Sequence, residues 1–170
     1  DPYAALAALL RGTVPPGGVP APPGELVVEP YPAGRGAPAP DPRRRLAVHG
    51  MTVHSGPADL AGALLTAMGC QVRWIVEELA TACRTAPGSV TVYGGALRLP
   101  GWRERRAAIN PWPTVRAPHP ETVSLGAACL AASAGGSDLT PPPPIPVRVG
   151  ADQLAAYDGY YRERFRATVG

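Results

Sequence analysis

The feature that most constrains the fold is a long apolar periodicity between residues 58 and 84. Apolar residues recur there at every third or fourth position, which is the period of an α-helix and of no other regular structure. These positions are Leu60, Leu64, Met68, Val72, Ile75, Leu79 and Cys83. Pro57 suits a first helical position, and Asp59 suits the positive end of the helix dipole. The sequence therefore predicts one long helix over Ala58 to Arg84.

Two glycines interrupt this predicted helix, at Gly62 and Gly69. Each glycine lowers helix propensity by about 1 kcal/mol relative to alanine. We therefore expect another part of the backbone to approach the helix closely at these two positions.

Proline and glycine are abundant but unevenly distributed, with 23 and 20 copies among 170 residues. Such a content is typical of low-complexity chains, yet 45% of the residues are hydrophobic and only 17% are charged, which is enough apolar surface for a core. The excess is concentrated before residue 47 and again between residues 134 and 150. We expect a short helix and Pro/Gly-rich leader over residues 1–24, a folded unit over 25–170, and an extended polyproline II connector at 140–146.

Around the long helix, short β-branched runs alternate with helical patterns, which is typical of an α/β unit. The predicted strands are residues 25–29, 46–53, 89–93 and 113–117, and the other predicted helices are residues 2–11, 102–108, 121–134 and 151–166.

The charges and cysteines do not favour a nucleic-acid, metal or redox protein. All 16 basic residues are Arg, the net charge is only +3, and the two short runs at 43–45 and 103–106 are expected to be solvated surface. The odd number of cysteines, without a CxxC pair, indicates reduced, buried thiols in a cytoplasmic protein. The three histidines match no zinc motif, no serine has the pattern of a hydrolase triad, and no run is apolar enough for a membrane helix or a signal peptide.

Two segments carry candidate chemistry. The predicted strand 89–93 ends at Gly94 and Gly95, where missing side chains allow a phosphate or a flat ligand to lie against the backbone. A plain turn is the alternative, and the absence of lysine excludes a Walker-type loop. The predicted helix 121–134 has a face of small residues, which either packs tightly on a neighbour or leaves room for a bound base.

These segments, in their order, resemble the C-terminal lobe of FGGY-family carbohydrate kinases over about residues 25 to 170. The run EPYPAGRGAPAPDPRRRLAVHGMTVHSGPADLAGALLTAM is similar to the family's "PYLAGERAP...D" passage and the helix that follows it. TVYGGALRLPGW resembles its nucleotide loop "GGG/GGA..SP.W", and ETVSLGAACLAA resembles its "EA.ALGAALLAA" helix. The closing AAYDGYYRERF is similar to the family's last tyrosine-rich segment.

The resemblance implies an actin/hexokinase-like (ribonuclease H-like) α/β lobe that is incomplete at its N-terminus. It implies ATP and Mg²⁺ as cofactors, a sugar, polyol or aldonate as phosphoryl acceptor, and the N-terminal sugar-binding lobe as the missing partner. Gly94, Gly95, Ala96 and Leu99 would bind the nucleotide, and the helix from Glu121 would back the adenine pocket.

The resemblance also implies that some catalytic parts of a complete kinase are absent from this sequence. The family's catalytic Asp and "GT(S)" phosphate loop would precede residue 1, so we expect no catalytic residue in this chain and no activity from it alone. Asp41 and Asp59 stand in other motifs, as a loop residue and a helix-start residue. Departures from the family pattern occur at Arg35, Gly36, Leu99, Arg105 and Arg106. A non-catalytic remnant or interaction module with the same fold is the main alternative, and a Pro-rich scaffold is a more distant one.

Overall fold

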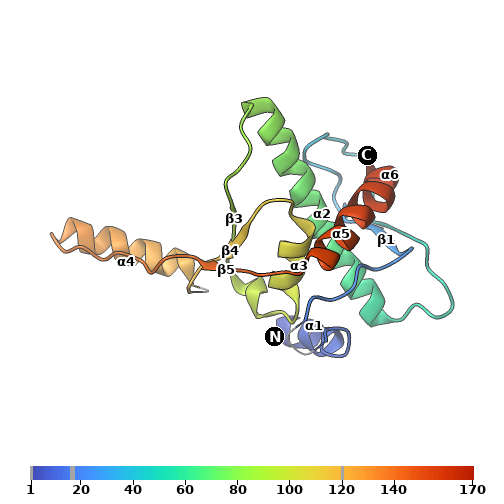
Figure 1. The fold of residues 1–170 in the computed structure, drawn as a ribbon, viewed down its shortest axis with the longest axis horizontal. Helices are drawn as coiled ribbons and strands as arrows, with labels where there is room; N and C mark the ends of the chain where they lie inside the picture. The colour runs from blue at the N-terminus through green and yellow to red at the C-terminus, as the bar shows by residue number, and fades with distance from the viewer. Residues whose placement is uncertain (1, 16–17, 120) are drawn as a thin grey trace.

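The computed structural model describes residues 2–15, 18–119 and 121–170. Its body is built around one long helix, α2 (Pro57–Cys83), and the chain folds against both sides of it (Figure 1). The predicted α/β arrangement is confirmed. A second helix, α4 (Thr122–Ala134), projects away from this body. No helix in the described ranges is both long and apolar enough to cross a membrane.

Local signals account for both ends of α2. At its start the Asp59 carboxylate accepts a hydrogen bond from the Gly56 N–H at 2.9 Å, which satisfies one backbone donor ahead of the helix. At its end Arg84 adopts the left-handed conformation with φ 51°, and its N–H bonds to the carbonyl groups of Ala80 and Thr81. The predicted long helix is thus confirmed over 27 residues.

The face that α2 buries is not the apolar stripe that revealed the helix. Its buried residues are Ala63, Leu65, Thr66, Ala67, Gly69, Cys70, Arg73 and Trp74. Four members of the stripe remain exposed, namely Leu64, Met68, Val72 and Leu79. The helix therefore has a buried face of small residues with Arg73 and Trp74, and an uncovered apolar face beside it.

There are two small sheets, of which the first packs on α2 and the second on α3. In the first, β1 (Val27–Glu29) pairs in antiparallel fashion with β2 (Ala47–His49). In the second, β3 (Val90–Val92) runs parallel to β4 (Thr114–Arg116), which pairs with an antiparallel β5 (Ile145–Pro146). The predicted polyproline connector is corrected at its end, because Ile145 and Pro146 form this third strand instead of running free.

The crossover between β3 and β4 consists of a 3₁₀ turn, η1 (Gly95–Arg98), and the helix α3 (Trp102–Ile109), which packs on α2. Gly69 makes this contact possible, since a Cβ there would lie 2.5 Å from Ile109 Cδ1. A close approach was expected at Gly69 and is confirmed, although a side chain rather than backbone makes the approach.

The C-terminal segment was expected to form one helix and instead contains a π-helical stretch. The helix α5 (Ala151–Gly159) continues into η2 (Tyr160–Phe165), a π-helix, and then α6 (Arg166–Val169). Three tyrosines of this segment are buried, and their hydroxyls reach other elements: Tyr157 donates to Pro20 O at 2.9 Å, and Tyr160 donates to Leu26 O at 2.8 Å. The wider π turn places Tyr160, Tyr161 and Phe165 in the core together.

The N-terminal helix α1 (Pro2–Leu10) packs on the N-terminal half of α2. Its Leu10 is fully buried and contacts Leu65 and Leu99, which forms a second, smaller core cluster.

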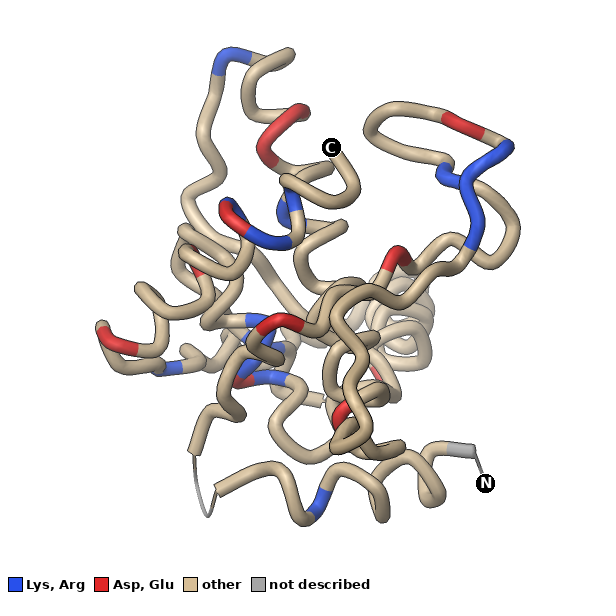
Figure 2. The backbone as a smooth tube through the Cα atoms, turned by 90° about the vertical axis from the view of Figure 1, so that its right-hand side faces the viewer, with Lys and Arg blue, Asp and Glu red and all other residues tan. Residues whose placement is uncertain are grey.

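The structure corrects the expectation that the second arginine run is solvated. Arg105 and Arg106 are only 2% and 7% exposed, because α3 turns them toward α2. Arg43 and Arg45 are exposed as expected. Elsewhere along the backbone, basic and acidic positions are interspersed (Figure 2).

A third buried arginine, Arg73, joins three elements. Its guanidinium binds Glu77 at 2.8 Å, the Ile109 carbonyl at 3.0 Å and Asp158 at 2.6 Å, and it lies 3.9 Å from the centre of the Tyr161 ring. Burial favours the protonated form of Asp158, but hydrogen bonds from Arg73 and Arg162 outweigh it and hold the pKa of Asp158 below its ordinary value. The stabilisation from this carboxylate is therefore present at neutral pH and is lost as the pH falls through the lowered pKa.

We expect Arg73→Met to lower the free energy of unfolding by about 2–3 kcal/mol, because it leaves both carboxylates and the Ile109 carbonyl without this donor. The matched control is Arg162→Met, which removes the exposed partner of Asp158 and should change the free energy by less than about 1 kcal/mol. Urea denaturation followed by circular dichroism measures both. Equal effects of the two variants would contradict the assignment.

The cysteines differ in environment, which corrects the expectation that all are buried. Cys70 is fully buried and burial raises its thiol pKa to about 12, whereas Cys83 is exposed and Cys129 is partly exposed. Only the thiolate reacts readily with thiol reagents.

In the native protein we therefore expect an aromatic disulfide reagent at pH 8 to label Cys83 and Cys129 and to leave Cys70 unlabelled until denaturant is added. Mass spectrometry of peptide fragments identifies the labelled sites, and Cys83→Ser serves as the control. Rapid labelling of Cys70 under native conditions would contradict the packing of α3 on α2.

Candidate functional site

The candidate site begins where β3 ends, at Gly94 and Gly95. Gly94 has φ 94°, a conformation that residues with a Cβ rarely adopt, and a Cβ built there would meet no atom within 4 Å. A Cβ at Gly95 would lie 3.7 Å from the hydroxyl oxygen of Tyr3 on α1. The turn thus presents bare backbone at the end of a strand, open at Gly94 and backed by Tyr3 at Gly95.

Ala96 and Leu99 lie in the same turn but face inward. Leu99 is 5% exposed and belongs to the cluster with Leu10 and Leu65, and Ala96 packs against that cluster. Among the four predicted nucleotide residues, the two glycines form the surface of the turn, while Ala96 and Leu99 attach it to α1 and α2.

An ion pair connects this turn to the start of α4. Arg98, in η1, binds Glu121 at 2.9 Å, and Glu121 is the residue that precedes the first turn of α4. The Glu121 N–H in turn donates to His119 Nδ1 at 3.1 Å. Because both partners of the ion pair are more than half exposed, the pair fixes an orientation more than it adds stability. The sequence reasoning did not assign Arg98 a role; its only signal was its place in the GGALR turn.

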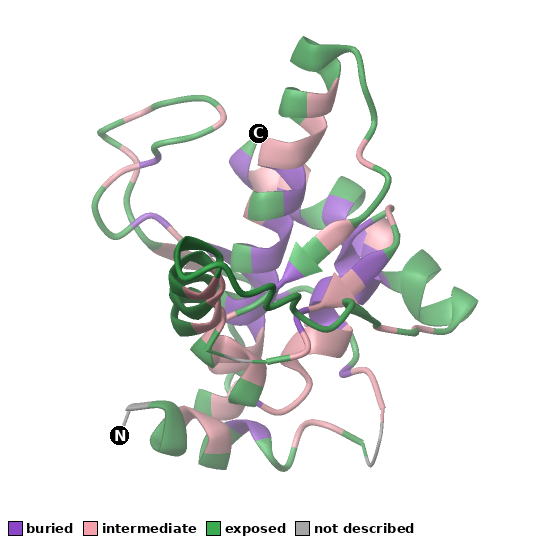
Figure 3. Cartoon of the chain, turned by 90° about the vertical axis from the view of Figure 1, so that its left-hand side faces the viewer, coloured by how far each residue is buried: buried purple, intermediate pink, exposed green. Residues whose placement is uncertain are grey.

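The helix α4 buries none of its own residues against the described part of the chain. None of its residues from Thr122 to Ala134 is buried, and Val123 and Leu130 are 84% and 75% exposed. Its exposed surface is visible in Figure 3. The small-residue face that includes Gly126 and Ala127 is therefore uncovered. Of the two alternatives that its sequence offers, tight packing on a neighbour is not seen among the described residues.

Asp59 and Asp41, the two acidic residues that lie outside the family's catalytic motif, have structural roles. Asp59 caps α2 through Gly56, and Asp41 exchanges backbone hydrogen bonds with Arg35 at 2.9 Å. The hydrogen bond from the backbone N–H of Arg43 lowers the pKa of Asp41 below its ordinary value. In the described ranges, no three His, Cys, Asp or Glu side chains gather as a metal site.

Comparison with known proteins places this arrangement in a family. Residues 17–135 match the C-terminal domain of the FGGY family of carbohydrate kinases. A glycerol kinase of Cereibacter sphaeroides is 38% identical over 113 residues, which cover 66% of this chain and 23% of that protein. A glycerol kinase of Afipia carboxidovorans is 41% identical over 118 residues, covering 65% of this chain and 22% of that protein.

Solved structures agree in fold. A Brucella ovis protein described as a "xyloylose kinase" superposes with a TM-score of 0.78 at 25% identity, over 98% of this chain and 34% of that one. Plasmodium falciparum glycerol kinase, solved with ADP, superposes with a TM-score of 0.71 over 100% of this chain and 34% of that one; at 16% identity it shows the fold alone. The chain thus spans about a quarter of the length of the curated relatives and a third of the solved ones. The chain belongs to the FGGY family of carbohydrate kinases and has the actin/hexokinase-like fold of their C-terminal domain.

Proposed function

We propose that this chain supplies the nucleotide side of a kinase that transfers the γ-phosphoryl group of ATP to a hydroxyl of a sugar, polyol or aldonate. The observation that carries the proposal is the open Gly94–Gly95 turn at the end of β3 in a chain of the FGGY family. Relatives and neighbours are described as glycerol, xylulose and gluconate kinases, which supports a polyhydroxylated acceptor. We assign the lobe to residues 25–170, with the leader 1–24 packed on it, and the N-terminal sugar-binding lobe as its partner.

The residues present fit a nucleotide. The space beside Gly94, which a Cβ would fill, lets a ligand approach the backbone, and the uncovered small residues of α4 leave room for a flat base. Arg98 lies between these two features through its ion pair with Glu121, and it provides a cation beside the turn. Leu99 is buried, so its contribution is to hold the turn in place rather than to contact the ligand with its side chain.

ATP, when bound, supplies the phosphoryl group that is transferred. The residues of this chain bind and orient: Gly94 and Gly95 hold the adenosine and phosphate side, and Ala96 and Leu99 keep the turn attached to the core. Mg²⁺ would be held chiefly by phosphate oxygens, because the described residues form no three-ligand cluster for it. Asp41 and Asp59 are engaged in a loop and a helix cap, so neither is assigned as the base that accepts the proton of the acceptor hydroxyl.

A second candidate is a non-catalytic interaction module that retains the fold. The exposed apolar stripe of α2 favours it, since uncovered apolar surface of this kind marks contact with another polypeptide. The two candidates differ in whether the Gly94–Gly95 turn binds a nucleotide.

We expect Gly95→Val to weaken Mg-ATP binding by about tenfold or more, equivalent to about 1.4 kcal/mol, because its side chain would crowd Tyr3 behind the turn and displace the backbone that the ligand meets. Isothermal titration calorimetry measures the change. The control is Gly88→Val, a glycine of the loop before β3 whose Cβ would meet no atom within 4 Å. Equal affinity of all three proteins would remove the nucleotide assignment, and absence of binding in the wild type would favour the interaction module.

We also expect no phosphoryl transfer from the 170-residue chain alone when glycerol, xylulose or gluconate is offered with Mg-ATP. The reason is that the two acidic residues considered as the base, Asp41 and Asp59, are engaged in a loop and a helix cap. Coupled detection of ADP checks this. Acceptor-dependent ADP release that Gly95→Val abolishes would show that the base lies within this chain.

A further inference from the structure

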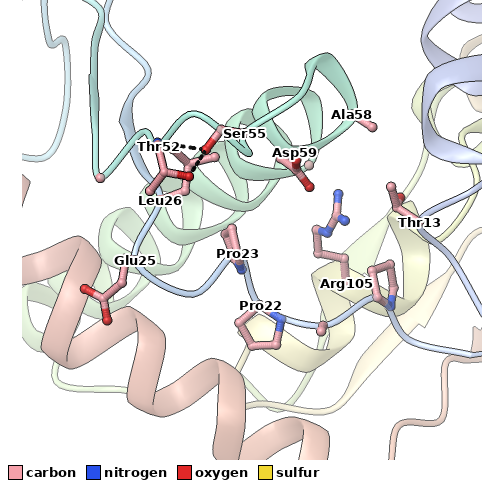
Figure 4. A pocket seen from close by; sticks show the side chains of 14 residues that line it. Thr13, Pro22, Pro23, Glu25, Leu26, Thr52, Ser55, Ala58, Asp59 and Arg105 are labelled. Carbon is pink, nitrogen blue, oxygen red and sulfur yellow. Dashed lines mark hydrogen bonds between the residues drawn. The ribbon is translucent and has the colours of Figure 1, made fainter.

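A cavity of about 410 Å³ lies on a different part of the molecule from the glycine turn. It is enclosed by the Pro-rich segment from Pro20 to Leu26, the loop between β2 and α2, the first turns of α2, and Arg105 of α3 (Figure 4). Neither Gly94 nor Gly95 lines it. Its volume is within the range of small-molecule sites.

Arg105 is the unusual residue of this cavity. Its side chain is among the cavity's lining residues and extends toward Asp59 and Thr13 in Figure 4, yet the residue is only 2% exposed. Its Nε and Nη1 atoms are buried and have no hydrogen-bond partner among the described residues. No ion pair within 4.0 Å joins it to an acidic side chain in the part of the chain that the structure describes.

The other buried arginines are compensated. Arg73 has two carboxylates and a carbonyl, Arg35 donates to the carbonyls of Ala39 and Val169, and Arg106 donates to Gly69 O at 3.1 Å. A buried guanidinium is unfavourable without acceptors for its N–H groups. Among these four arginines, Arg105 is the one with two fully buried nitrogens that lack a partner, although its side chain also interacts with Tyr157, and it lines a cavity.

The rest of the lining is suited to a small polar guest. Thr13, Thr52 and Ser55 line the cavity, although their hydroxyls already take part in local hydrogen bonds. Gly62 places no side chain beside the guanidinium, where a Cβ would lie 3.6 Å from Arg105 Nη2. Two carboxylates also line it: Asp59 already accepts the N–H of Gly56, and Glu25 is paired with Arg164. Their charge disfavours a polyanion such as a triphosphate and restricts the site to one compact anionic group.

We propose that this cavity binds a compact oxyanion, a phosphate or carboxylate group, which the buried fork of Arg105 holds. The planar guanidinium presents paired N–H donors that match either group, and the burial of Arg105 strengthens the contact. This site is independent of the proposed nucleotide function, because it uses none of the residues of the glycine turn.

The test is the thermal midpoint of the 170-residue protein titrated with inorganic phosphate, with acetate, and with sodium chloride at matched ionic strength. Phosphate should raise the midpoint of the wild type in a saturable manner, as a ligand of the folded state does. Arg105→Met should abolish the rise. The matched control is Arg103→Met, which changes an arginine of the same helix that pairs with Glu104 outside the cavity, and it should retain the rise.

A rise with acetate as well as phosphate assigns a general oxyanion site, and a rise with phosphate alone assigns a phosphate site; both support the proposal. An equal rise with sodium chloride, or an equal rise in Arg105→Met, overturns it. Gly95→Val should respond to phosphate as the wild type does, which separates this site from the nucleotide turn.

A second measurement does not depend on the folding of a variant. The Nε–H signal of Arg105 in the ¹⁵N–¹H spectrum of the wild type should move with phosphate concentration and reach a plateau. An unmoved Arg105 signal at saturating phosphate would overturn the proposal.

Discussion

The structure depends on the buried contacts by which Arg73 joins α2 to α3 and to the C-terminal helix. Its guanidinium binds Glu77 one turn along α2, the carbonyl at the end of α3, and Asp158 on the C-terminal helix, while Tyr161 stacks against it. These elements come from distant parts of the sequence, and the small residues of α2 allow them to approach. Once α3 is fixed there, the crossover that precedes it is fixed as well, and with it the position of the Gly94–Gly95 turn at the end of β3.

The sequence predicts the elements of this fold better than their surroundings. The period of residues 58–84 identifies α2 almost to the residue, because helix geometry is local. The same period misleads about burial, since the face that packs consists of Ala63, Ala67 and Cys70 rather than the larger apolar residues of the stripe. Which face is buried depends on what approaches it, and that is a tertiary property that no local pattern contains.

At the candidate site, too, the sequence predicts the elements but not what surrounds them. The strand, the glycine pair and the helix after it are read from their residue types, and motif order identifies the family. The inward direction of Leu99, the ion pair of Arg98 with Glu121 and the uncovered face of α4 depend on how α1 and α4 sit, so sequence patterns do not predict them. The buried arginines of α3 were missed for a related reason: a charged run normally indicates solvent, and only the crossing of α3 over α2 places Arg105 and Arg106 inside.

Two buried arginines differ in whether the rest of the chain provides acceptors for their N–H groups. Arg73 and Arg105 are both 2% exposed, so desolvation acts on both side chains. For Arg73 the chain provides every acceptor, and the residue is explained fully by its role in joining helices. For Arg105 the described chain provides the Tyr157 side chain as a partner but leaves Nε and Nη1 without an acceptor, and the side chain lines a cavity. The proposed oxyanion would compensate this buried charge, because its geometry matches the paired donors of a guanidinium.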